Sequence, residues 1–291
     1  MNLSIILKRS AYLMLAIALG SLTGCDDDPA NNGLTATNVD AAFTIAPVAG
    51  KVNTYLLTAQ ENGVISSKWD IGYGPYMGKM EEEVVLPDAG TYTVTHTAIA
   101  AGGATSKVSH DIVVAASDPA KPNLVRGGFF NNAADIAQWS SAKLSATGAA
   151  FWSFNSGTAT IHSPGGWAQE GIYQAIDVVK DKEYTIDMLV SCPSGSDETW
   201  FEVYAGKSVP KDGVEYKDNK VMGLSTWDGC AKGAFTGRLS SVGCVKNDGT
   251  ASVSNVVKFD TTGKIYLLIR SGGNTFTKDG ITVSRIEMRG K

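Results

Sequence analysis

The chain of 291 residues carries 25 basic and 29 acidic side chains, a formal charge of −4, and its composition is 43% hydrophobic with 32 glycines. A mildly acidic balance without basic clusters excludes the electrostatic footprint of a nucleic-acid-binding protein. The length exceeds what one small core needs and predicts two domains.

Residues 1–24 have the pattern of a secretory signal peptide. Lys8 and Arg9 precede an apolar run over 11–19, which is too short to span a bilayer. The segment ends in Leu22-Thr23-Gly24-Cys25, which resembles a bacterial lipobox. The resemblance implies cleavage before Cys25, lipidation of its thiol and an exported lipoprotein. An uncleaved helix with an incidental cysteine is the alternative.

Residues 25–39 form an expected tether. Three aspartates, Asp26 to Asp28, follow the cysteine, and a proline, two asparagines and a glycine come next. Such a segment cannot bury apolar area and favours a flexible spacer. It also resembles the acidic export signal of surface lipoproteins in the Bacteroidetes, which implies a place on the outer face of the outer membrane. A solvated spacer without a sorting role is the alternative.

Three further cysteines follow, Cys192, Cys230 and Cys244. The last two flank a glycine-containing stretch and are able to close a loop in an oxidising compartment. The sequence leaves open whether they form a disulfide or remain buried thiols. No CxxC motif occurs and the histidines lie far from the cysteines, so the sequence offers no support for a zinc site.

Short alternating runs between turn signals predict an all-β protein, with no long stretch of helical periodicity. Residues 40–117 contain about seven such runs, the density of an immunoglobulin-like sandwich. The expected strands in this part are 42–45, 55–58, 66–71, 82–86, 91–95 and 108–114.

Two motifs in this part resemble those of PKD domains. Residues 69–74, Trp-Asp-Ile-Gly-Tyr-Gly, are similar to the Trp-Asp-Phe-Gly-Asp-Gly signature, and 89–95, Ala-Gly-Thr-Tyr-Thr-Val-Thr, are similar to the second motif. The resemblance implies a spacer domain. Trp69 and Tyr92 are expected to pack across the two sheets, whereas Tyr73, in place of the usual aspartate, and Tyr76 lie in a turn and are expected at the surface.

Residues 118–122 contain two prolines and predict a stiff linker. Residues 123–291 follow as one larger β domain, in which roughly ten strands favour a double-sheet jelly roll. The expected strands are 151–154, 158–161, 172–178, 183–188, 200–204, 256–259, 264–269 and 280–288.

This part resembles carbohydrate-binding modules of the jelly-roll type. The matching positions are Asn123-Leu124 through Phe129, Trp139, Gln174, Tyr184 and the closing run Asp279-Gly280-Ile281-Thr282-Val283. Trp139 and Tyr184 are expected in the core. Phe130 replaces the acidic residue that often helps to hold a structural calcium ion, and Lys182 replaces a turn glycine. A calcium site through Asp279 and backbone carbonyls stays open.

Sugar recognition needs flat apolar rings beside a few fixed polar groups, and the second domain supplies both. Trp167 and Trp227 lie in loops, while Trp200 and Tyr204 share one face of a strand with Glu202. For each of these aromatic residues, the alternative to a ligand contact is a purely structural position, packed in or against the core. The expected glycan contacts are Trp152, Trp167, Trp200, Tyr204, Trp227, Gln174 and Arg270.

Catalysis has little support in the sequence. There is no nucleophile elbow, zinc-protease helix, phosphate loop or dinucleotide fingerprint. Glu202, Asp187 and Asp228 are available as the carboxylate pair of a glycosidase, but a non-enzymatic role is preferred.

Anchor, spacer and module together predict a cell-surface lipoprotein that binds polysaccharide for a polysaccharide-utilisation system. The expected partners are a glycan, by analogy a β-glucan of the laminarin type, and an outer-membrane glycan importer. The alternative is a structural or adhesive surface lipoprotein that binds protein partners.

Overall fold

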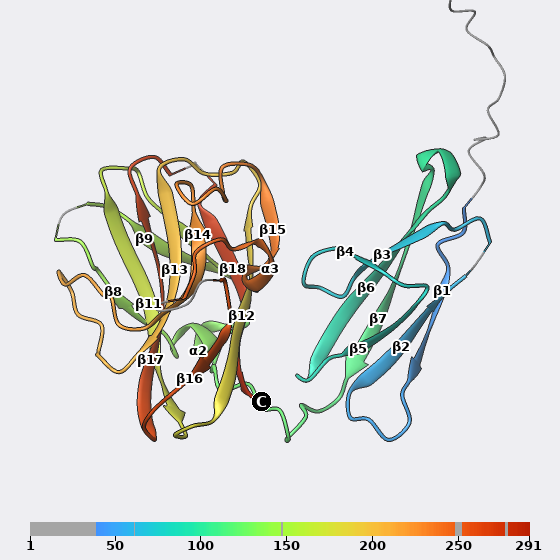
Figure 1. Cartoon of the computed structure of the whole chain (residues 1–291), viewed down its shortest axis with the longest axis horizontal. Coiled ribbons are helices and arrows are strands. Elements are labelled where there is room, and N and C mark those ends of the chain that lie inside the picture. The colour runs from blue at the N-terminus through green and yellow to red at the C-terminus, as the bar shows by residue number, and fades with distance from the viewer. Residues whose placement is uncertain (1–38, 61, 147, 248–251, 277–278) are drawn as a thin grey trace, which may run out of the picture.

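The computed structural model describes residues 39–291 except 61, 147, 248–251 and 277–278. The expected signal peptide 1–24, Cys25 and all of the tether except Val39 therefore lie outside the described residues. Antiparallel strands make up nearly all of the regular structure, in two sets of sheets that share no strand (Figure 1). The all-β expectation is confirmed.

The N-terminal part has two sheets. The three-stranded sheet has the order β1 (Phe43–Pro47), β2 (Thr54–Ala59), β5 (Glu81–Val85). The four-stranded sheet has the order β4 (Tyr76–Gly78), β3 (Ser66–Asp70), β6 (Gly90–Ile99), β7 (Thr105–Val114), with the single 3₁₀ turn η1 (Ala101–Gly103) between β6 and β7.

The core of this part is built around Trp69, which is fully buried. Its indole stacks on His96 at 4.3 Å between ring centroids, meets Phe43 edge-on at 5.2 Å, and donates its N–H to the Lys79 carbonyl oxygen. Tyr92 is also buried, and its hydroxyl donates to the Asp88 carbonyl oxygen. The expected inward packing of Trp69 and Tyr92 is confirmed.

The C-terminal part also has two sheets. The six-stranded sheet has the order β15 (Phe235–Arg238), β12 (Glu183–Cys192), β18 (Ile281–Gly290), β10 (Thr158–His162), β9 (Phe151–Asn155), and β16 (Val256–Lys258) also pairs with β12. The five-stranded sheet has the order β14 (Lys220–Ser225), β13 (Thr199–Gly206), β17 (Gly263–Gly273), β11 (Ala168–Val178), β8 (Ser140–Ala142).

One large apolar core lies between these two sheets. The six-stranded sheet contributes Ile186 and Val283, and the five-stranded sheet contributes Phe201 and Ile269, all of them fully buried. Two single-turn helices, α2 (Ala133–Ile136) and α3 (Leu239–Val242), fill connections. Trp139 and Tyr184 belong to this core, as expected.

Every strand anticipated from the sequence is present, with shifted ends. β4, β8, β14 and β15 were not anticipated. The immunoglobulin-like and jelly-roll topologies, and the domain boundaries, stay predictions. Within the described part of the chain, no helix has the length and apolar character that a membrane crossing requires.

The structure joins Cys230 to Cys244 in a disulfide, which resolves the open alternative. Cys192 is buried, and its thiol donates to the Gly195 carbonyl oxygen.

Candidate functional site

The five-stranded sheet has one face against the core and one face that points away from it, here called the outer face. Alternation along β13 separates them: Phe201 and Val203 enter the core, whereas Trp200, Glu202 and Tyr204 point outward. The pairing register extends the outer face sideways, because directly paired residues share a face. Trp200 pairs with Ser225 and Gly272, and Gly272 pairs with Gln169.

Arg270 organises the polar part of this face. Its guanidinium donates to the Glu202 carboxylate at 2.8 and 3.2 Å, to the Gln169 side-chain carbonyl at 3.0 Å and to the Tyr204 hydroxyl at 2.9 Å. The Tyr204 hydroxyl in turn donates to Glu202 at 2.8 Å. Arg270 is only 4% exposed, so its positive charge is held in place by a network of hydrogen bonds.

Two aromatic rings enclose the same guanidinium. Its central carbon lies 4.6 Å from the Trp200 ring centroid and 4.8 Å from that of Tyr204. Burial raises the pKa of the Tyr204 hydroxyl, an effect that Arg270 opposes and Glu202 reinforces. The hydroxyl therefore stays protonated near neutral pH and keeps its hydrogen bond to Glu202.

Only one end of the outer face is open. The connection between β13 and β14 folds back over the other end, where buried Tyr216 meets Tyr204 edge-on at 5.6 Å between ring centroids. Leu144 and Leu268 complete this small cluster. Trp200 lies toward the open end, half-buried, over Gly272, where an added Cβ would come within 2.7 Å of its ring.

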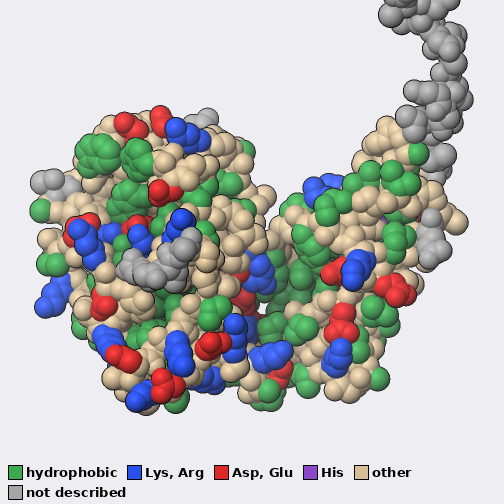
Figure 2. Space-filling view, in the orientation of Figure 1, with side chains coloured by type: hydrophobic (Ala, Val, Ile, Leu, Met, Phe, Trp, Pro, Cys, Tyr) green, Lys and Arg blue, Asp and Glu red, His purple; other side chains and the backbone are tan. Residues whose placement is uncertain are grey.

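Two exposed tryptophans stand at the open end. Trp167 immediately precedes β11 and Trp227 follows β14 by two residues, and the register brings both strand ends to the same end of the sheet. The rings are 58% and 56% exposed, nearly parallel at 22°, with centroids 6.1 Å apart. Hydrophobic side chains gather at this upper end of the C-terminal part (Figure 2). This exposed ring pair is the candidate contact surface of the sheet.

Local backbone conformation presents both rings. Gly165, Gly166 and Trp167 all have positive φ, and a bulky residue in that region is an outlier that the surrounding structure must hold in place. Trp227 lies in a turn in which the Ser225 hydroxyl accepts the backbone N–H groups of Trp227 and Asp228, both at 3.2 Å. The disulfide begins at Cys230, directly after this turn.

The structure therefore places five of the seven expected glycan contacts on one face: Trp167 and Trp227 are exposed, Trp200 is half-buried, and Tyr204 and Arg270 are buried beneath them. Gln174 lies elsewhere: it is 3% exposed, and its amide exchanges two hydrogen bonds of 3.0 Å with the backbone of Arg126. Gln174 therefore holds the backbone at Arg126 in place, and its side chain offers no surface to a ligand.

Two further expectations are corrected by burial. Trp152 packs inward, 9% exposed, with its indole N–H directed to the Glu170 carbonyl oxygen at 3.4 Å, so it is absent from the outer face. Tyr73, expected at the surface, is 8% exposed because Arg238 and Arg285 lie against its ring. For Trp152, the alternating pattern of its strand does not show which face of that strand packs against the second sheet.

Asp279, the side chain named for a calcium site together with backbone carbonyls, is half-buried. Among the residues that the structure describes, no group of three or more His, Cys, Asp or Glu side chains is placed to hold a metal ion.

Sequence reasoning missed Gln169 and Gly272. Gln169 ties Arg270 to the edge of the sheet, and Gly272 leaves the room that the Trp200 ring occupies. The available sequence signal for Gln169 was its spacing of two from Trp167, which keeps side chains on one face of an extended chain. Gly272 gave no such signal.

The sequence matches no protein-family model, and no curated protein matches it. Among solved structures, one from a study of promiscuous specificity in β-sandwich carbohydrate-binding modules aligns over 85% of this chain and 96% of its own, at 15% identity and a TM-score of 0.34. A CBM4 carbohydrate-binding module aligns over 57% and 99%, at 16% identity and a TM-score of 0.29.

The enzymatically active domain of the tailspike protein 4 of bacteriophage CBA120 is similarly distant. It aligns over 62% of this chain and 23% of its own, at 12% identity and a TM-score of 0.33. Similarities of this size carry no argument about function, which has to rest on the side chains of the outer face.

Proposed function

We propose that this chain is a non-catalytic, cell-surface lipoprotein that binds polysaccharide through the open end of the outer face. The observation that carries the proposal is the exposed Trp167–Trp227 pair beside the fixed polar groups around Arg270. Aromatic faces cover the axial C–H surface of a pyranose, and Arg270, held by its hydrogen bonds, lies against the half-buried Trp200 ring on the same face. The Trp167, Trp200 and Trp227 rings lie toward the same end of this sheet.

The hydrogen bonds made by the candidate carboxylates support binding without catalysis. Glu202 is occupied by Arg270, and Asp187 accepts the Ser240 hydroxyl at 2.6 Å and the backbone N–H of Met188 at 2.9 Å. Carboxylates held in this way stabilise the sheet, and of the three acidic residues considered for catalysis only Asp228, beside Trp227, is exposed.

The open, shallow geometry favours weak binding at each site, micromolar or weaker. A polymer compensates, because a second contact on the same chain occurs at a high effective concentration. We place the protein on the outer membrane by the lipobox and the acidic tether, as a partner of a glycan importer, and take laminarin-type β-glucan as the first ligand to test.

The test is affinity electrophoresis of the purified protein through gels that contain a panel of polysaccharides, laminarin first. Retardation by one glycan class, weakened in Trp167→Ala and in Trp227→Ala, supports the proposal. Met77→Ala is the matched control, since Met77 is a 61% exposed apolar side chain of the N-terminal part. Unchanged mobility of the folded protein across the panel would favour a structural or adhesive role.

A further inference from the structure

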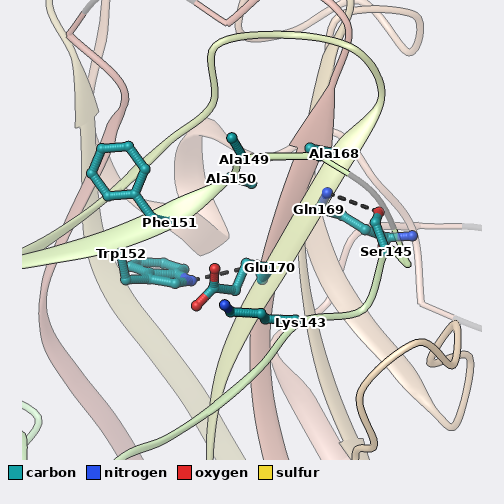
Figure 3. A pocket seen from close by; sticks show the side chains of 10 residues that line it. Lys143, Ser145, Ala149, Ala150, Phe151, Trp152, Ala168, Gln169 and Glu170 are labelled. Carbon is teal, nitrogen blue, oxygen red and sulfur yellow. Dashed lines mark hydrogen bonds between the residues drawn. The ribbon is translucent and has the colours of Figure 1, made fainter.

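A second group of side chains lies at the edge of the C-terminal part, away from the outer face. There β8 and β9 are the outermost strands of the two facing sheets, and a cavity of about 330 Å³ opens beside them. That volume lies within the range of about 300–1,000 Å³ that small-molecule sites occupy. Its lining includes Lys143, Ser145, Phe151, Trp152, Gln169 and Glu170 (Figure 3).

A neighbouring cavity of about 530 Å³ continues this one, and the two share Ala149 and Phe151. Phe151 is 52% exposed, and its ring stacks on His162 at 5.1 Å and 22°. An exposed ring therefore stands between two connected hollows, here called together the edge cleft. A chain molecule lying in the edge cleft would pass over this ring.

The smaller cavity holds two groups of opposite charge. Glu170 is 7% exposed, and Figure 3 shows its carboxylate and the Lys143 ammonium on the same side of the cavity. Burial raises the pKa of the Glu170 carboxyl, and the Lys143 charge opposes that rise. Within the described residues, no side-chain hydrogen bond or ion pair engages either charged group, so both are available to a ligand.

These groups select the chemistry of the ligand. The Glu170 carboxylate would repel an anionic ligand, and the Lys143 ammonium would repel a cationic one. The hydroxyl groups of a neutral sugar can donate hydrogen bonds to the carboxylate and accept them from the ammonium. The Phe151 ring adds an apolar surface for the C–H face of the sugar. We infer that the edge cleft is a second glycan-binding site, which takes an uncharged sugar chain.

The inference rests on the proposed function, because it takes the ligand to be a glycan, but it needs no residue of the tryptophan pair. Gln169 lies between the two sites: its backbone N–H donates to Ser145 at the edge cleft, and its side chain accepts from Arg270 on the outer face. One polysaccharide chain spanning both sites would gain avidity without a new contact.

Calorimetry with a hexasaccharide of the retained polysaccharide, laminarihexaose if laminarin is retained, counts the sites. We expect two sites per chain in the native protein. Phe151→Ala with Glu170→Gln should leave one site, Trp167→Ala with Trp227→Ala should leave the other, and the four changes together should abolish binding. Because Phe151 is half exposed, its replacement should leave the fold intact, which circular dichroism checks.

The matched control is Met77→Ala with Glu215→Gln, two exposed positions away from both sites, which should keep two sites. A single site that disappears with the tryptophan pair and is untouched by Phe151→Ala and Glu170→Gln would overturn the edge cleft and leave the proposed function standing. Absence of binding to every polysaccharide of the panel would overturn both.

Discussion

Trp167 combines an exposed side chain with a strained backbone conformation. Its φ of 60° lies in the left-handed region, which costs a non-glycine residue about 1–2 kcal/mol. More than half of the ring is exposed, so the core gives little in return for that cost. This combination supports the binding role proposed for Trp167.

Trp167→Gly should therefore be more stable than Trp167→Ala, by about 1 kcal/mol, although both lose the stacked ring. Urea unfolding of the two variants measures the difference, and gel retardation should be weakened in both. The same pair of changes at Trp227, which has no positive φ, is the control and should show no advantage for glycine. Equal stability of the two Trp167 variants would contradict the assignment of strain.

The Glu170 carboxyl leads to a prediction about how the stability of the protein depends on pH. Burial raises the pKa of its carboxyl above the ordinary value of 4.5, so the folded protein binds this proton more tightly than the unfolded chain. The resulting stability is fully present below the unfolded pKa and is lost as the pH rises through the folded pKa. Replacement by glutamine should remove this loss.

Thermal unfolding of Glu170→Gln and of the native protein should therefore give similar midpoints near pH 4, with the variant higher near pH 7. The control is Glu215→Gln, at an exposed position in the connection between β13 and β14. A midpoint difference that does not change with pH, or that is shared by the control, would contradict the role given to Glu170.

For single residues, the sequence predicted which side chains share a face or lie in exposed loops better than it predicted which face of a strand packs against the core. Spacing of two placed Trp200, Glu202 and Tyr204 on one face, and the structure agrees. The loop positions of Trp167 and Trp227 implied exposure, and both are exposed. Gln174 is a structural residue, and Trp152 lies away from the outer face in the lining of the edge cleft, because a strand's pattern does not reveal which of its faces meets the partner sheet.

At the scale of elements, the strands with clear alternation were predicted and four others were not. β14 is the instructive case, because five of its six residues are buried. A strand covered on both faces has no alternating pattern to detect. β4 and β8 have only three residues each, too few for any period to appear. β15, Phe235–Arg238, is four residues long and contains a glycine.

The element that presents Trp227 depends on the disulfide. Cys230 and Cys244 are 14 positions apart, and closing a loop of that length stabilises a protein by about 3 kcal/mol in the chain-entropy account. The bridge also fixes the end of the turn at Ser225, where the Cys230 backbone N–H donates to the Ser225 carbonyl oxygen. Loss of the bridge should therefore affect both stability and ligand retention.

The double variant Cys230→Ser, Cys244→Ser should lose about 3 kcal/mol in urea unfolding and show weaker gel retardation. Reduction of the native protein should reproduce both effects. Alkylation before reduction provides the check on the bond itself, since neither cysteine should be labelled. Labelling of both in the folded, unreduced protein would contradict the disulfide.

At the scale of the whole molecule, the two parts meet through a short series of arginine contacts. Tyr73 of the N-terminal part lies against the guanidinium groups of Arg238 and Arg285, at 3.9 and 5.1 Å from its ring centroid. Arg289 pairs with Asp88 across the same junction. Glu287 then links Arg289 to Arg238 through hydrogen bonds of 2.9 and 2.8 Å.

This junction favours a fixed arrangement over two independently moving parts. Burial alone would lower the pKa of Arg289, but its hydrogen bond with Asp88 and the charge of Glu287 outweigh burial and raise it. Removing the arginine would leave Asp88, only 8% exposed, without its partner. Breaking a buried ion pair in this way costs about 3–5 kcal/mol. In the proposed function, a spacer held rigidly would project the open end of the outer face in one direction.

We therefore expect Arg285→Ala with Arg289→Ala to destabilise the junction by about 3 kcal/mol and to release the two parts from each other. Small-angle X-ray scattering should show a larger radius of gyration and a broader distance distribution than the native protein. Lys51→Ala is the control, because its ion pair with Glu83 is exposed and contributes about 1 kcal/mol or less. Scattering that matches the native curve in the double variant would mean that the arginine contacts do not set the arrangement, and the linker prolines would have to do so alone.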